Sequence, residues 1–166
     1  MVIKLKDNVL PATGLKIDIR NGVFDLNEFL SKAKTWFFRK QYDYAEKKHS
    51  DKDLPQGHEV NIICVNDRKV SDYIKFHIDM DLFITDMKKT KVDGRTFEKG
   101  NFEARFFAWL ELDYKKKWQS RPFANFLLHV YNNYIIKKQI QDYEDKLYDE
   151  VMELFSKLKK VLGTYH

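Results

Sequence analysis

A short alternating segment, His77-Ile-Asp79-Met-Asp81, holds the side chains of this sequence best suited to chemistry. In an extended strand, residues two positions apart lie on one face, about 7 Å from each other. An imidazole and two carboxylates would therefore share a face, and adjacent members could bind one metal ion if the strand curves. The alternative is a solvated face whose charges pair with neighbours such as Arg105. No cysteine or second histidine lies nearby in the sequence, so we predict neither a metal site nor a cofactor.

Aromatic residues interrupt the polar faces of two predicted strands, at Phe83, Phe107 and Trp109. Rings among polar groups are typical of an apolar pocket or of a stacking surface. Such rings are more often covered by another helix or by a second subunit. If the face does bind a ligand, the predicted binding residues are His77, Phe83, Arg105, Phe107 and Trp109.

Basic runs favour a different class of function. The net charge is +5, and lysines cluster at Met87–Lys91 and Tyr114–Trp118. Together with Lys137 and Lys138 they could form a phosphate-binding patch. For this alternative, a nucleic-acid-binding or protein-interaction module, the predicted contact residues are Lys115, Lys116, Lys117 and Trp118. Solvated charges at strand ends are the simpler interpretation of the same runs.

No catalytic motif is present in the sequence. It contains no Gly-rich phosphate loop, no nucleophile elbow and no zinc motif. An enzyme would need His77, Asp79 and Asp81 to converge in a cleft, and we favour a protein that is not an enzyme. The single cysteine, Cys64, lies in a buried strand pattern and cannot form an internal disulfide. With no apolar run long enough to span a bilayer, these features predict a cytoplasmic protein.

The alternation of apolar and polar residues predicts an antiparallel sheet. The expected strands cover residues 14–20, 60–64, 74–84, 88–97 and 102–114, with a further N-terminal strand at 2–6. A two-residue turn at Asp93-Gly94 alone would pair the apolar face of one strand with the polar face of the next. Either a β-bulge intervenes or residues 88–97 form a separate strand, and we favour the separate strand.

Two helices are expected, one on each side of the strand-rich region. Asp25 is a good N-cap with Glu28 three residues later, and the first helix is predicted to run to about Lys48, followed by a loop at 49–57. The second is predicted to run from Ser120 to Gly163 as one continuous helix. It carries two apolar stripes offset by roughly 130°, so its two halves should face different neighbours.

The order β-α-β-β-β-β-α predicts an α+β fold in one domain spanning residues 1–166. This order resembles the helix-grip fold of START-like and polyketide-cyclase-like proteins, in which an antiparallel sheet wraps a long C-terminal helix. The resemblance rests on the order of the elements and covers most of the chain. It implies a cavity between sheet and helix that often holds an apolar ligand. We therefore expect a binding protein for an apolar or lipid-like small molecule.

The predicted C-terminal helix also suggests self-association. Its second half carries a seam at spacings of three and four residues: Ile136, Ile140, Tyr143, Leu147, Val151, Leu154, Leu158 and Val161. A continuous helix of about 64 Å is longer than a compact domain of this size can cover. The sequence therefore predicts a homodimer through this helix, the alternative being a break near Lys138 that lets the helix fold back.

Overall fold

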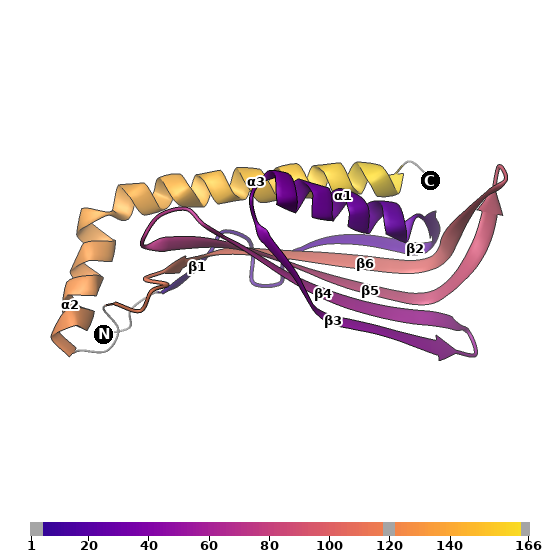
Figure 1. Ribbon diagram of the computed structural model, residues 1–166, viewed down its shortest axis with the longest axis horizontal. Coiled ribbons are helices and arrows are strands. Elements are labelled where there is room, and N and C mark those ends of the chain that lie inside the picture. Colours follow the sequence, from indigo (N-terminus) through magenta and orange to yellow (C-terminus); the bar gives the residue numbers. More distant parts are fainter. Residues whose placement is uncertain (1–4, 118–121, 164–166) are drawn as a thin grey trace.

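The computed structural model describes residues 5–117 and 122–163, which form one antiparallel sheet with helices along it (Figure 1). The strands are β1 (Lys6–Asn8), β2 (Leu15–Phe24), β3 (Asp43–Leu54), β4 (Gly57–Lys69), β5 (Ile74–Val92) and β6 (Arg95–Leu112). The helices are α1 (Leu26–Arg39), α2 (Pro122–Val130), the π-helix η1 (Tyr131–Ile135) and α3 (Lys137–Gly163). The predicted α+β class and the order of strands and helices are confirmed.

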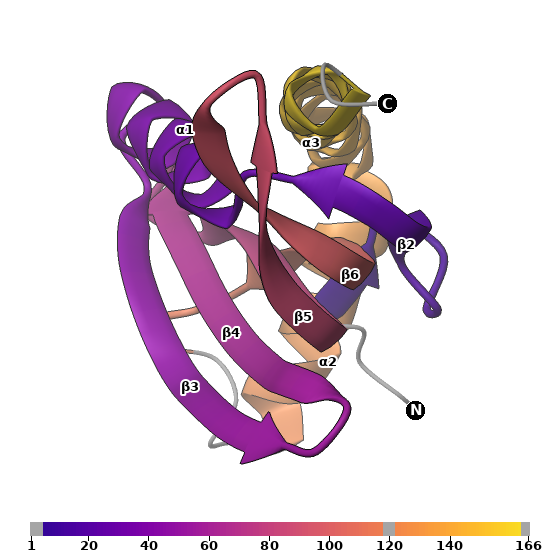
Figure 2. The same ribbon diagram turned by 90° about the vertical axis from the view of Figure 1, so that its right-hand side faces the viewer.

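The sheet has six strands in the order β1-β6-β5-β4-β3, and β2 pairs with another part of β6. Helices α1 and α3 lie on the same side of the sheet, and no helix among the described residues covers its other side (Figures 1 and 2). Strict alternation along β5 and β6 directs one set of side chains under the helices. The largest fully buried members of this set are Ile74, Phe76, Ile78, Met80, Leu82, Ile84, Phe102 and Phe106.

The first helix begins as predicted but ends earlier. The side chain of Asp25 accepts a hydrogen bond from the backbone N–H of Glu28 at 2.9 Å, which satisfies one unpaired donor of the first turn. The chain leaves the helix after Arg39 and turns through Gln41, which has a φ of 64°. Residues predicted as the end of the helix and the following loop instead form β3. This strand is polar because it is an edge strand, where charged side chains discourage further pairing.

A β-bulge in β5 lets its apolar face lie on the same side as that of β6. Residues 88–97 belong to these two strands, so the prediction of a separate strand there is wrong. The two strands are connected by a two-residue turn at Asp93-Gly94, with φ of 50° and 79°. The register shifts between Thr85 and Lys88, which brings the apolar faces of both strands to the same side. Gly100 lies opposite this bulge, and a Cβ there would come 2.8 Å from the carbonyl oxygen of Thr85.

The predicted continuous helix is interrupted. A π-helical turn, closed by a hydrogen bond of 3.0 Å from the N–H of Ile136 to the carbonyl of Tyr131, separates α2 from α3. Ile136 leaves the helical conformation, and α2 bends away past the end of the sheet (Figure 1). The break lies where the two apolar stripes change direction. The predicted N-cap, Ser120, lies outside the described residues.

The apolar seam of α3 is covered by the protein's own sheet. Its buried members are Ile136, Ile140, Leu147, Val151, Leu154, Leu158 and Leu162, the last in place of the predicted Val161. Rings from the helix and the sheet meet in this layer: Tyr143 lies edge-on to Phe76 at 5.9 Å, and Phe155 to Phe106 at 5.6 Å. The 19 residues of β5 reach about 60 Å, so a 27-residue helix of about 40 Å fits along them. The reason for predicting a homodimer is thereby removed.

One ionic network lies between α1, β4 and α3. The carboxylate of Glu150, with 8% of the residue exposed, accepts hydrogen bonds of 2.7 Å from both Arg68 and the hydroxyl of Tyr42. Arg68 also donates to the carbonyl oxygen of Lys40 at 2.7 Å, which caps the C-terminal end of α1. A buried carboxylate is tolerated only when it is paired and fully hydrogen-bonded, so this network fixes how the two helices sit together.

We therefore expect Arg68→Met to lower the free energy of unfolding by roughly 3–5 kcal/mol, because Glu150 would keep a buried charge without its cation. The matched control is Arg39→Met. Arg39 pairs with Glu153 at 3.2 Å, but its side chain is 57% exposed. Arg39→Met should therefore lower the free energy of unfolding by less than about 1 kcal/mol. Urea denaturation of the three proteins measures the difference, and equal losses would contradict a structural role of the network.

Candidate functional site

The helix-free face of the sheet carries all five residues predicted to bind a ligand, of which Phe107 and Trp109 line a hollow. In the pairing of β5 with β6, His77 lies opposite Trp109, Asp79 opposite Phe107 and Asp81 opposite Arg105. Phe83 follows two positions further, opposite Glu103. Alternation along both strands therefore places these side chains on one surface, as the sequence predicts. Beside them lies a hollow of ≈ 430 Å³, lined in part by Asp79, Asp81, Phe107, Trp109 and the 10–12 loop.

The aromatic centre of this face is already engaged by the protein itself. The rings of His77 and Trp109 stack at 3.8 Å with an interplanar angle of 1°. The ammonium of Lys6 lies 4.4 Å from the centre of the Trp109 ring. Glu111 contacts Nε2 of His77 at 2.7 Å. These contacts satisfy the polar groups and leave little of the indole surface for stacking with a ligand, so the predicted binding role stays a prediction.

The two aspartates of this face are partly removed from water. Burial raises the pKa of Asp79 above its usual value, although a hydrogen bond with Trp109 and the charges of His77 and Lys6 act in the opposite direction. Burial also raises the pKa of Asp81, against the lowering effect of Arg105. Across the described residues, no group of three or more His, Cys, Asp or Glu side chains could hold a metal ion. The two carboxylates can accept hydrogen bonds or a positive charge.

The lysines of the alternative site lie at the end of β6. Lys115 forms an ion pair of 2.6 Å with Asp72, and its hydrogen bond lowers the pKa of that carboxyl below its usual range. Lys116 and Lys117 are exposed, and the backbone N–H of Lys117 donates to Asp113. Trp118 lies outside the described residues. The role of these lysines in binding a nucleic acid also stays a prediction.

Cys64 is buried as its strand pattern predicts. It lies on the helix-covered side of β4, and the hydroxyl of Tyr44 approaches its sulfur at 3.2 Å. Burial raises the pKa of the thiol, although the hydrogen bond with Tyr44 lowers it. A neutral, inaccessible thiol is a poor nucleophile, so Cys64 contributes to packing.

A second cavity, of ≈ 490 Å³, lies at the end of the sheet beside the helical break. It is lined by Asp72, Tyr73, Asp113, Lys117, Leu127, Leu128, Val130, Tyr131 and Ile135. Tyr73, the residue directly before β5, contacts the helical break: its ring lies edge-on to Tyr131 at 5.6 Å and its hydroxyl donates a hydrogen bond to Asn132. We call this the end cavity. Its walls are mostly apolar, and its charged side chains come from two short segments beside the sheet.

The sequence interpretation missed the end cavity because it placed Leu127, Val130 and Tyr131 on one apolar stripe of a continuous helix. The available signal was the change of direction between the two stripes, which marks where the helix breaks. Once α2 bends away from the sheet, side chains that would have joined the core line a recess instead. Leu127 is 39% exposed as a consequence of that break.

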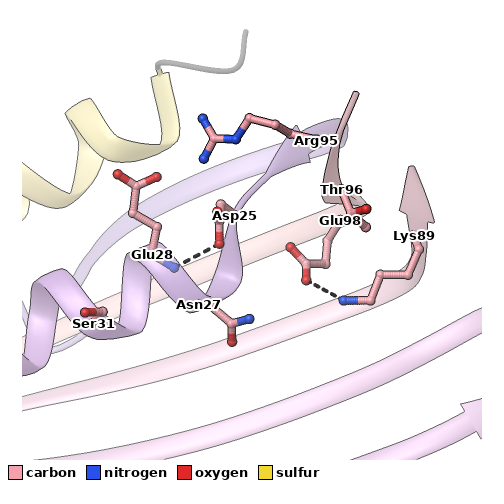
Figure 3. Close-up of a pocket in the computed structure, with 8 residues that line it drawn as sticks. All are labelled: Asp25, Asn27, Glu28, Ser31, Lys89, Arg95, Thr96 and Glu98. Carbon is pink, nitrogen blue, oxygen red and sulfur yellow. Dashed lines mark hydrogen bonds and ion pairs between the residues drawn. The ribbon is translucent and has the colours of Figure 1, made fainter. Parts of the chain in front are cut away.

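A third hollow, of ≈ 610 Å³, is explained by the architecture alone (Figure 3). Glu98, only 6% exposed, accepts hydrogen bonds from the backbone N–H of Leu26 at 3.2 Å and from Lys89 at 2.8 Å. It thereby joins the N-terminal turn of α1 to the β5–β6 hairpin. Asp25 and Glu98, two of the carboxylates that line this hollow, are thus engaged in contacts with the first turn of α1.

Comparison with known proteins found no relative of this chain. No protein-family model matches the chain. Neither the curated proteins nor the solved structures give a match. The resemblance to helix-grip proteins therefore rests, as before, on the order of the elements.

The raised pKa of Asp79 gives a pH-dependent prediction. A carboxyl that holds its proton more tightly when folded makes the folded state lose stability as the pH rises from about 4 through the folded pKa. We expect Asp79→Asn to raise the urea midpoint at pH 7, because it removes a desolvated charge and keeps a hydrogen-bond acceptor. The gain should shrink as the pH falls toward about 4.

Asp18→Asn is the matched control with the opposite sign. Desolvation is the largest single effect and raises the pKa of Asp18, but the hydrogen bonds with Lys16 and Arg20 and the charges of these two residues together lower it below its usual value. Its substitution should lower the midpoint at pH 7 and lose its effect in acid. A destabilised Asp79→Asn protein at pH 7 would show that the charge of Asp79 is favourably bound in the folded state.

Proposed function

We propose that this protein binds an apolar or lipid-like small molecule and that the end cavity holds it. The observation that carries this proposal is an apolar recess of ≈ 490 Å³ beside a core whose other apolar side chains are in contact. Ligand pockets are typically 300–1,000 Å³, mostly apolar, with a few polar groups that orient the ligand. The end cavity has this composition.

The polar groups of the cavity suggest the chemistry of the ligand. Lys117, Asp72 and Asp113 come from the segments beside the sheet, whereas the residues from α2 and η1 are apolar. Asp72 is held ionised by its pair with Lys115, so a charged edge adjoins an apolar wall. An amphipathic molecule with an apolar body and a polar end fits both. The hydrophobic effect supplies the affinity, and the charged edge sets the orientation.

The proposal is tested with the environment-sensitive dye 1-anilinonaphthalene-8-sulfonate, which has an apolar body and one anionic group. We expect saturable binding by the folded protein. Leu127→Gln, which places an amide in the apolar wall, should weaken the dye about tenfold, because burying a polar group without a partner costs at least about 1.4 kcal/mol.

Val92→Gln is the matched control. Val92 lies at the tip of the β5–β6 hairpin with 40% of the residue exposed, against 39% for Leu127. This variant should bind the dye as the unchanged protein does. Mass spectrometry of an organic extract of the protein, purified from its own host, then identifies the natural ligand. Unsaturable dye binding, or equal binding by both variants, would show that the end cavity is not a binding site.

A further inference from the structure

The α2–η1 arm carries exposed aromatic residues that do not line the end cavity, although Leu127 of the cavity wall lies on the same side of the helix. Phe123, Phe126 and Tyr134 are 72%, 50% and 77% exposed, and none of them lines that cavity. Their spacings of three and eight residues place them on one side of the helix. We call these three residues the arm face. Exposed apolar groups gathered in one place are a mark of an interaction surface.

The position of the arm makes this face accessible. In Figure 1 the arm turns away from α3 and extends past the end of the sheet, where no other described element covers its outer side. At 1.5 Å per residue its 9 α-helical and 5 π-helical residues extend about 20 Å. This is too short to cross a bilayer, and no helix in the described ranges has the length and apolarity for a span.

Lysines at both ends of the arm indicate the partner. Lys116 and Lys117 lie shortly before it, and Lys137 and Lys138 follow it directly. All four are exposed, and none forms an ion pair with another described side chain. An aromatic face flanked by lysines is the composition of helices that lie in the interface of an anionic membrane. The net charge of +5 adds a long-range attraction of the whole protein to an anionic membrane.

Other occupants fit these residues less well. A symmetric contact through the arm would bring the lysines at its two ends close to those of the second copy, and like charges at an interface oppose association. A single-stranded nucleic acid would use rings for stacking, but aliphatic Leu127 and Ile135 adjoin the arm face and have no role in base stacking. Hydrocarbon accommodates both kinds of side chain.

We propose that the α2–η1 arm docks this protein on an anionic lipid surface, with Phe123, Phe126 and Tyr134 entering the interface and Lys137 and Lys138 meeting lipid phosphates. The aromatic rings supply the apolar burial, and the lysines make binding depend on lipid charge and on salt. This docking goes beyond the ligand proposed for the end cavity. It uses different side chains and does not require that cavity to be occupied.

The test is co-sedimentation of the full chain with phosphatidylcholine vesicles that contain or lack phosphatidylserine. The unchanged protein should bind the phosphatidylserine vesicles at least about tenfold more tightly, and added salt should reduce this binding. Phe123→Gln with Phe126→Gln should weaken it about tenfold or more. Phe38→Gln, at a residue on α1 that is 84% exposed, is the control for the loss of a surface ring and should have no effect.

The charge is tested in parallel. Lys137→Gln with Lys138→Gln should weaken binding to phosphatidylserine vesicles about thirtyfold, because both lysines would lose their attraction to the anionic lipid surface. Lys47→Gln with Lys48→Gln changes the net charge equally on the exposed edge strand β3 and should have a smaller effect. Dye binding in the end cavity should survive in the Phe123→Gln/Phe126→Gln protein. A failure of docking is thereby distinguished from a failure of the proposed function.

Three outcomes would overturn the docking proposal. The first is equal vesicle binding by the unchanged protein and the arm variants. The second is a dimer in sedimentation equilibrium that dissociates on Phe123→Gln/Phe126→Gln, which would assign the arm face to a second copy. The third is binding of single-stranded RNA that these substitutions abolish, with no binding to vesicles of either composition.

Discussion

The contact between the apolar stripe of α3 and the long ribbon of β5 and β6 is the interaction on which this structure depends. Buried side chains from Ile140 to Leu162 lie along the helix and meet the alternating apolar residues of both strands. Burying a large aliphatic side chain contributes about 1.5–3 kcal/mol before the entropy of ordering is subtracted, so this layer outweighs any single polar contact. The Glu150 network adds little net stability by comparison, but it restricts how α1, β4 and α3 can be arranged.

That layer is continuous only because a bulge corrects the register of the hairpin. Without the shift between Thr85 and Lys88, a two-residue turn would direct the apolar residues of β5 and β6 to opposite sides of the sheet. Gly100 permits the close approach of the backbone opposite the bulge. The same correction places His77, Asp79 and Asp81 with Arg105, Phe107 and Trp109 on the helix-free face. Core formation and the gathering of these polar and aromatic residues are thus two results of one register.

Local patterns in the sequence predicted what depends on local physics. Alternation along residues 74–84 and 102–114 identified both the buried face and the five side chains opposite it, and Asp25 marked the start of α1. The edge strand β3 was not predicted, because it pairs through backbone hydrogen bonds and its polar side chains follow no alternating pattern. The same polar residues are typical of a helix end followed by a loop. The continuous C-terminal helix was wrong because no proline or glycine marks the break. The end of the sheet at Tyr73, about 60 residues earlier in the chain, contacts Tyr131 and Asn132, and such a contact has no local signature.

The break also explains why the apolar residues of the C-terminal region have two different surroundings. A helix that continued α3 in a straight line on its N-terminal side would extend past the end of the sheet and leave the apolar side chains of α2 uncovered. The π-helical turn redirects α2 so that Leu128, 1% exposed, and Tyr131 meet the sheet end, while Phe123 and Tyr134 stay on the outside. The turn therefore closes one apolar surface and leaves another open. π-Helical turns of this kind recur at functional sites because they reposition side chains without disrupting the helix on either side. Here the repositioned side chains form both the wall of the end cavity and the arm face.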